Sequence, residues 1–290
     1  MDRYSFITLT EKGACSLLPR RDALSHKGSF GTLLIAAGSE NYIGAASLCT
    51  ESALKSGVGI VCLASVHQAV TVCAARCPEA TYLICETDNG QISGAAADKI
   101  IEKSKTAAAV LIGCGLGHTA NTEKLVKRLL TETNIPKVID ADGLNCIANE
   151  PQLVKNSIIT PHAGEMARLC GCDIAEIKAD PAQAAADFAA KYNCVVVLKD
   201  ADTVVASPEG KLFFNIGRNS GLAKGGSGDV LAGIMASLLA QGMKPFECAM
   251  TAVTLHSAAA KRCAQKYSER GMLPHEISES LREIFAENKR

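Results

Sequence analysis

Short apolar runs alternate with helix-like stretches along most of this 290-residue chain, and this alternation constrains its fold more than any other feature. The runs with the length and content of buried strands are 32–37, 58–63, 80–85, 107–112, 137–140, 157–160 and 195–198. Strands that are apolar on both faces are typical of parallel sheets covered by helices on both sides. The pattern therefore predicts an α/β fold with a central, mainly parallel sheet and helices on both faces.

The remaining patterned segments are one helix near the start, a hairpin and three helices at the end. The expected helices are 44–55, 227–241, 246–267 and 275–287, and the expected hairpin pairs 203–206 with 211–214. No linker, low-complexity run or solenoid-length repeat interrupts the series. We therefore expect a single domain over residues 1–290.

Charge and composition exclude several classes of partner. The 30 basic and 30 acidic residues give a formal net charge of zero, which argues against nucleic-acid and membrane-surface binding. No segment is apolar for long enough to span a bilayer, and the start lacks a secretory pattern. The 13 cysteines show no zinc-finger spacing and predict reduced, structural thiols. Together these features predict a cytoplasmic protein that acts on small molecules.

Polar and glycine-rich segments follow five of the predicted strands. They cover residues 38–45, 113–117, 140–145, 160–165 and 199–203. In an open parallel sheet, ligands bind beyond the carboxyl ends of the strands. We therefore expect these segments to converge on one crevice, together with a glycine-rich loop at 225–229.

The loop Gly225–Asp229 runs directly into an apolar helix. Its glycines allow a ligand to approach the backbone, and the first free N–H groups of the helix form an anion site. Asp229 has two interpretations: it is an ordinary helix cap, or it accepts a proton from a group that attacks a bound phosphate. On the loop alone, the two interpretations are equally weighted.

The other polar positions at the strand ends also leave alternatives open. Asp140 and Asp142 either hold Mg²⁺ through water or cap the next helix, and the cap is favoured for Asp142. His162, beside Glu165, contacts a ligand or bonds the backbone, and the neighbouring carboxylate favours the ligand. Lys199 neutralises a phosphate or forms an ion pair.

Taken together, these motifs resemble one known family, the NAD(P)H-hydrate dehydratases of the ribokinase-like fold. The resemblance extends in order from about residue 16 to residue 285. Its most specific segments are Thr160–Glu165 (TPHAGE) and Gly225–Asp229 with the helix that follows, and it also includes 26–31, 44–46, 115–117, 140–145, 198–203 and 221–223.

The resemblance implies a repair reaction. Members of the family use a nucleotide to phosphorylate the hydroxyl of hydrated NADH or NADPH (NADHX or NADPHX), and loss of phosphate then restores the double bond. It further implies Mg²⁺, ADP or ATP as co-substrate with ADP expected for a bacterial-looking chain, and a homotetramer.

The resemblance also assigns roles to residues of this chain. Asp229 would be the catalytic base and would contact the substrate, with Glu165 supporting Mg²⁺ through water. The hydrated dinucleotide would be bound by Ala45, Gly117 and His162. The nucleotide would be bound by Lys199, Asp200, Ala201, Asp202, Thr203, Gly226, Ser227 and Gly228. The last three would also form the anion hole.

Two charges depart from the family pattern. Asp200 replaces a glycine, and Lys224 replaces a small residue before the glycine loop. Lys224 would then add a phosphate contact or balance the charge of Asp200.

Three other functions compete with the dehydratase: a vitamin-alcohol kinase of the same fold, a nucleotide-binding regulator without catalysis, and a dehydrogenase. The dehydrogenase is disfavoured because Gly113, Gly115 and Gly117 do not have the spacing of a dinucleotide-binding motif.

Overall fold

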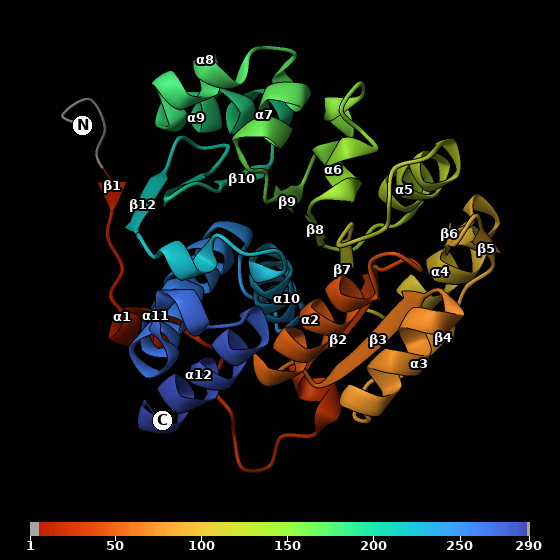
Figure 1. Cartoon of the computed structure of the whole chain (residues 1–290), viewed down its shortest axis with the longest axis horizontal. Coiled ribbons are helices and arrows are strands. Elements are labelled where there is room, and N and C mark those ends of the chain that lie inside the picture. Colours follow the sequence, from red (N-terminus) through yellow and green to blue (C-terminus); the bar gives the residue numbers. More distant parts are fainter. Residues whose placement is uncertain (1–5, 289–290) are drawn as a thin grey trace.

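A ten-stranded sheet forms the centre of the computed structural model, which describes residues 6–288 (Figure 1). Within this sheet, all strand pairs are parallel except β10–β11 and β11–β12. In spatial order the strands are β1 (Phe6–Ile7), β12 (Leu212–Ile216), β11 (Asp202–Ala206), β10 (Val195–Leu198), β9 (Ser157–Ile159), β8 (Lys137–Ile139), β7 (Ala109–Ile112), β2 (Thr32–Ala36), β3 (Ile60–Ser65) and β4 (Thr81–Ile84). The predicted mainly parallel sheet is confirmed.

Helices cover both faces of this sheet, as predicted (Figure 1). One face carries α1 (Glu11–Leu17), α2 (Ile43–Lys55), α3 (His67–Arg76), α10 (Ser227–Ala240), α11 (Pro245–Gly271) and α12 (Pro274–Glu287). The other carries α4 (Ala97–Ser104), α5 (Ala120–Glu132), α6 (Asp142–Asn145), α7 (Ala163–Cys170), α8 (Ile174–Ala179) and α9 (Pro181–Tyr192). Short 3₁₀ turns occupy Lys27–Phe30, Gly94–Ala96, Pro151–Val154 and Ser220–Leu222.

Some elements differ from the sequence prediction. The two-residue strands β1, β5 (Thr87–Asp88) and β6 (Gln91–Ile92) were not predicted, because two residues carry no periodicity. The helix expected at 246–267 extends to Gly271 across a non-helical residue, Ser268, with φ +66°. Among residues 6–288, no helix has both the length and the apolar content needed to cross a bilayer.

The strand order reverses between β2 and β7. From β2 the chain continues outward to β3 and β4, whereas β7 leads the other way to β8, β9 and β10. The segments after β2 and β7 meet there, where the Gly38 amide donates to the Cys114 carbonyl at 2.8 Å. Such a switch point is where open α/β sheets bind their ligands.

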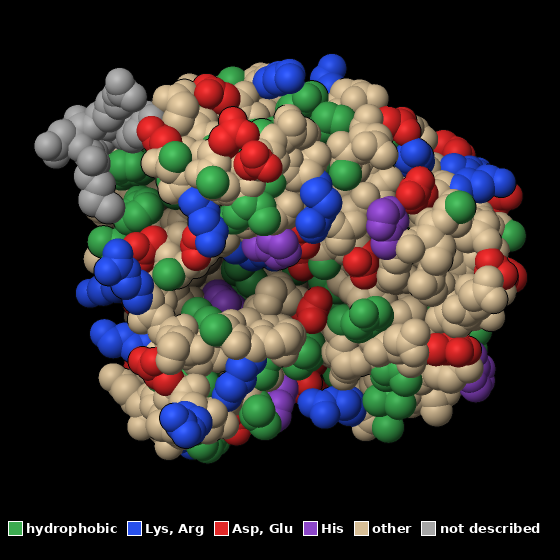
Figure 2. All heavy atoms as spheres, turned by 45° about the horizontal axis from the view of Figure 1, so that its top comes forward, with side chains coloured by type: hydrophobic (Ala, Val, Ile, Leu, Met, Phe, Trp, Pro, Cys, Tyr) green, Lys and Arg blue, Asp and Glu red, His purple; other side chains and the backbone are tan. Residues whose placement is uncertain are grey.

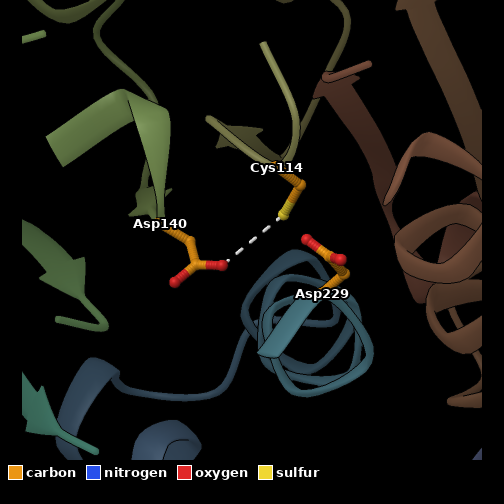
Figure 3. A group of neighbouring side chains, drawn as sticks. All are labelled: Cys114, Asp140 and Asp229. Carbon is orange, nitrogen blue, oxygen red and sulfur yellow. Dashed lines mark hydrogen bonds between the residues drawn. The ribbon is translucent and has the colours of Figure 1, made fainter. Parts of the chain in front are cut away.

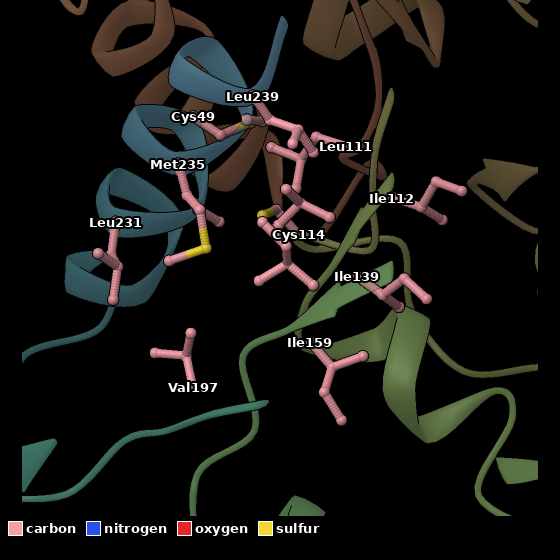
Figure 4. Close-up of a cluster of buried hydrophobic side chains, with 14 of the residues drawn as sticks. Cys49, Leu111, Ile112, Cys114, Ile139, Ile159, Val197, Leu231, Met235 and Leu239 are labelled. Carbon is pink, nitrogen blue, oxygen red and sulfur yellow. The ribbon is translucent and has the colours of Figure 1, made fainter. Parts of the chain in front are cut away.

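Helix α10 is buried around nearly its whole circumference. It packs on β2, β7 and β8, and its apolar side chains Leu231, Met235 and Leu239 lie against the sheet (Figure 4). It also packs against α2, α11 and α12, and Gly233 makes its close approach to α2 possible. A Cβ at Gly233 would lie 2.3 Å from the carbonyl oxygen of Cys49.

We expect Gly233→Ala to lower the free energy of unfolding by about 1–3 kcal/mol, because α2 or α10 must shift to accommodate the methyl group. Urea denaturation of the purified variant measures this. Gly44→Ala is the matched control: it lies in α2, the helix that Gly233 packs against, its new methyl group meets nothing within 4 Å, and helix propensity favours alanine. Equal stability of the Gly233 and Gly44 variants would contradict the packing argument.

Candidate functional site

Asp229 lies in the first turn of α10, at the carboxyl edge of the sheet. The helix begins after Gly226, whose φ of +103° places it in the left-handed region, and no side chain caps this end. The interpretation of Asp229 as an ordinary cap is therefore wrong. Burial, and then the nearby charge of Asp140, raise the pKa of Asp229 from its usual 3.8 to about 7.

Asp140 follows β8 and faces Asp229, with the thiol of Cys114 beside both carboxylates (Figure 3). Ligand atoms of the three residues lie within 4.8 Å of one another. The Cys114 thiol donates to Asp140 Oδ2 at 3.7 Å, and the Thr160 hydroxyl donates to Asp140 Oδ1 at 2.6 Å. Asp140 is therefore held in place by the ends of β7 and β9.

Lys199 supplies the positive charge of this cluster. Its Nζ donates to Asp140 Oδ1 at 2.7 Å. The Lys199 side chain is 21% exposed and that of Asp140 is 2% exposed. Burial acts to lower the pKa of Lys199, but Asp140 and Glu165 outweigh it, so the net pKa is raised. The ammonium stays charged and also lies near Gly228, since a Cβ there would be 3.4 Å from Nζ.

Backbone N–H groups at the start of α10 are available to an anion. Among the described residues, the amides of Gly226, Gly228 and Asp229 have no hydrogen-bond acceptor, whereas the Ser227 amide donates to the Lys224 carbonyl at 3.3 Å. Free amides at a helix N-terminus attract anions. The geometry thus supports Gly226 and Gly228 more directly than Ser227, and it adds the Asp229 amide to the expected set.

His162 is the N-cap of α7. Its Nδ1 accepts from the amides of Gly164 (2.9 Å) and Glu165 (3.2 Å), and Glu165 Oε2 accepts from the His162 amide at 2.8 Å. The backbone interpretation of His162 is therefore realised, and only Nε2 remains for a ligand. One oxygen of Glu165 is engaged in the cap, and the other lies 3.6 Å from His162 Nε2.

Residues 199–203 form the turn between β10 and β11. Asp200 is exposed and its carboxylate accepts from the Ala201 amide, so it faces solvent. Asp202 pairs with Arg218 at 2.7 Å. Neither predicted role of Lys224 is seen, because its ammonium donates to the carbonyl oxygens of Arg270 (2.7 Å) and Met272 (2.5 Å).

The remaining predicted substrate residues lie near the switch point. Gly117 donates its amide to Asp142 Oδ2 at 2.8 Å. The preferred interpretation of Asp142 as a helix cap is wrong, since Ala141 precedes α6 and the Asp142 carboxylate holds the β7 loop instead. Ala45, in the first turn of α2, packs against Gly115.

Sequence reasoning missed the contributions of Cys114 and Thr160 to the site. Cys114 lies two residues after β7 and Thr160 directly follows β9, so their position at strand ends was a usable signal. The face in Figure 2 is hollowed near its middle, with basic, acidic and histidine side chains around the hollow.

These features define an α/β protein of the ribokinase-like class, with an anion site beside a partly buried carboxylate. The family model of NAD(P)H-hydrate dehydratase matches residues 33–283, and the chain belongs to this family. The ADP-dependent (S)-NAD(P)H-hydrate dehydratase of Bacillus subtilis is 35% identical, over 95% of this chain and 96% of its own length.

Solved structures and longer relatives agree with this assignment. A Bacillus subtilis NAD(P)H-hydrate dehydratase co-crystallised with ATP and Mg²⁺ has a TM-score of 0.81 and 32% identity, covering 97% of this chain and 98% of its own. A bifunctional NAD(P)H-hydrate repair enzyme of Moorella thermoacetica is 38% identical over 94% of this chain. This chain spans about half the length of such bifunctional relatives, 52% in that case.

Proposed function

We propose that this protein restores hydrated NADH or NADPH to the intact dinucleotide, with a nucleotide as phosphoryl donor. The observation that carries the proposal is Asp229, a partly buried carboxylate with a raised pKa beside free amides at the start of α10. The name of the Bacillus subtilis relative supports the reaction and favours ADP as the donor.

The chemistry has two steps. The hydroxyl oxygen of the hydrate attacks the terminal phosphorus of the donor, and Asp229 takes the hydroxyl proton as that bond forms. The bond from phosphorus to the bridging oxygen breaks, so that ADP leaves as AMP. The carbon–oxygen bond then breaks with loss of phosphate, and the proton on the adjacent carbon leaves as the double bond re-forms.

The proposed binding roles follow from where the residues lie. The N–H groups of Gly226 and Gly228 stabilise the charge that develops on the phosphoryl oxygens, and Ser227 belongs to the same turn. Residues 199–203 contact the nucleotide, with the Lys199 ammonium nearest to the helix start. Ala45, Gly117 and His162 contact the hydrated dinucleotide, His162 through Nε2.

Mg²⁺ is the proposed metal, and the oxygen atoms present suit it. Mg²⁺ binds phosphates and one or two carboxylates and retains water. The carboxylate of Asp140 would provide such an oxygen, whereas the Cys114 sulfur is a poor ligand for this ion and Asp229 is left to accept the proton. Glu165 suits the metal only through water, because its Oε2 is already bonded. When bound, the ion would neutralise charge on the transferred phosphoryl group.

The test mixes purified protein with NADHX or NADPHX, Mg²⁺, and either ADP or ATP, and follows the absorbance of the restored dinucleotide. We expect recovery with faster turnover on ADP, together with stoichiometric AMP and phosphate. A lasting phosphate ester would instead identify a kinase, and no recovery with either donor would overturn the proposal. The homotetramer and the cytoplasmic location stay predictions.

A further inference from the structure

A second hollow lies beside the residues proposed to contact the hydrated dinucleotide. It has a volume of about 540 Å³ and is lined from α5, α6 and α7, and we call it the α5–α7 hollow. Its lining includes His118, which directly follows Gly117, and Arg168 of α7. No described residue of α10 lines it. The α5–α7 hollow therefore borders the substrate region on the side away from the transferred phosphoryl group.

A chain of hydrogen bonds joins Arg168 to the substrate region. The Gly117 amide donates to Asp142 Oδ2 at 2.8 Å, and Asn145 Nδ2 donates to Asp142 Oδ1 at 3.3 Å. Arg168 then donates to Asn145 Oδ1 through Nε at 3.1 Å and through Nη2 at 2.9 Å. The guanidinium is thus held in one orientation by two side chains of α6, although it is exposed to solvent.

The charge of Arg168 has no counter-ion within the protein. Its acceptor Asn145 is neutral, and no carboxylate among the described residues forms an ion pair with it. The two carboxylates that line the α5–α7 hollow already have basic partners, in the pairs Glu123–His118 (3.0 Å) and Glu150–Lys127 (2.6 Å). Arg168 therefore supplies an uncompensated positive charge to this hollow.

A guanidinium held in this way is suited to a phosphate. Its planar fork of N–H donors matches phosphate oxygens, and the bonds to Asn145 leave both hydrogens of Nη1 and one of Nη2 for a ligand. A structural bond to Asn145 would need no charge, since a neutral amide could donate to the same oxygen. The charge therefore indicates an anionic ligand.

The position of Arg168 indicates which part of the substrate would meet it. Arg168 follows His162 by six residues, which is about 9 Å along α7 at about 1.5 Å per residue. At that separation it would engage a remote group rather than the reacting nicotinamide ring. Beyond that ring and its ribose, both hydrates carry a pyrophosphate, and NADPHX also carries a 2′-phosphate on the second ribose.

We propose that Arg168, positioned by Asn145 and Asp142, binds a phosphate group of the hydrated dinucleotide in the α5–α7 hollow. This rests on the proposed function and deepens it, because it separates the phosphates of the substrate from the anion site at the start of α10. The pyrophosphate and the 2′-phosphate share the same chemistry, and the two hydrates distinguish them experimentally.

The test compares Arg168→Gln with Arg168→Lys in the whole chain, with NADHX and NADPHX as separate substrates. Glutamine keeps a donor but loses the charge, whereas lysine keeps the charge but loses the planar fork. We expect Arg168→Gln to raise KM about 10- to 100-fold with kcat within about threefold, because a remote phosphate contact is made equally in the ground state and the transition state. Arg168→Lys should raise KM by only about 3- to 10-fold. A rise for both hydrates identifies the pyrophosphate, and a rise for NADPHX alone identifies the 2′-phosphate.

Lys178→Gln is the matched control. It removes the same charge from an exposed position of α8, which packs on α7, and Lys178 does not line the α5–α7 hollow. We expect a wild-type KM from it. Salt gives a second readout: added salt should raise the KM of the wild-type protein more steeply than that of Arg168→Gln, since screening weakens a contact between charges.

A wild-type KM for both hydrates in Arg168→Gln would overturn the proposal. An equal rise of KM in Lys178→Gln would also overturn it, because the effect would then reflect the overall charge rather than a contact. A wild-type protein that restores neither hydrate would instead count against the proposed function, which separates the two failures.

Discussion

Replacing Asp229 with asparagine is expected to lower kcat about a thousandfold, because the amide cannot accept the hydroxyl proton during phosphoryl transfer. In the wild-type protein, the pKa of about 7 predicts that kcat rises with pH through neutrality and levels off above it, as the carboxyl loses its proton. Steady-state kinetics between about pH 5 and pH 9 measure both effects. Near-normal activity in Asp229→Asn would exclude this residue as the base.

The same substitution should stabilise the fold. The pKa of the Asp229 carboxyl is about 7 in the folded protein and about 3.8 in the unfolded chain. The folded state therefore binds more protons between these values, and the stability due to this group falls as the pH rises. The difference corresponds to about 4 kcal/mol at most.

Asp229→Asn removes this penalty and should be about 2–4 kcal/mol more stable than wild type at about pH 8, and equally stable at about pH 4. Urea denaturation at the two pH values tests this and serves as the folding control for the kinetic experiment. A variant that is less stable at both values would mean that lost activity reflects damage to the fold.

Replacing Lys199 with methionine is the second large effect that we expect. It leaves the Asp140 carboxylate, 2% exposed, without its ion pair, and breaking a buried pair from one side costs about 3–5 kcal/mol. The Lys199 charge also acts to lower the pKa of Asp229. Its loss should move the midpoint of the pH–kcat profile above about 7.

A double-mutant cycle separates the pair from the individual side chains. We expect Lys199→Met combined with Asp140→Asn to recover part of the lost stability, because no uncompensated charge then remains buried. The double variant should also return the Asp229 midpoint toward its wild-type value, since Asp140 is the main charge that raises it. Additive losses of stability and an unmoved midpoint would show that the two residues are not coupled.

Local pattern was sufficient to predict most of the sheet. The strand at 195–198 agrees with β10 residue for residue, and the hairpin was found because Ser207–Gly210 separates two patterned runs. Two-residue strands such as β1 were missed, because their pairing depends on a distant partner, β12, rather than on local periodicity.

The candidate site was predicted in its location but not in its contacts. The rule that ligands gather at carboxyl strand ends brought the right segments together, and the structure joins them through Asp140, Cys114 and Lys199. The cap at Asp142 was wrong and neither role expected of Lys224 was seen, because both side chains find partners far along the chain, Gly117 and the carbonyls of Arg270 and Met272.

The sequence by itself determined the parallel sheet, the glycine loop and the position of Asp229 in the first turn of α10, because these depend on short-range pattern and backbone chemistry. Only the tertiary structure decided that Asp229 is a partly buried carboxylate with a raised pKa rather than a cap. Its raised pKa comes from burial and from Asp140, 89 positions away in the chain, and both arise only when β8 and α10 pack together.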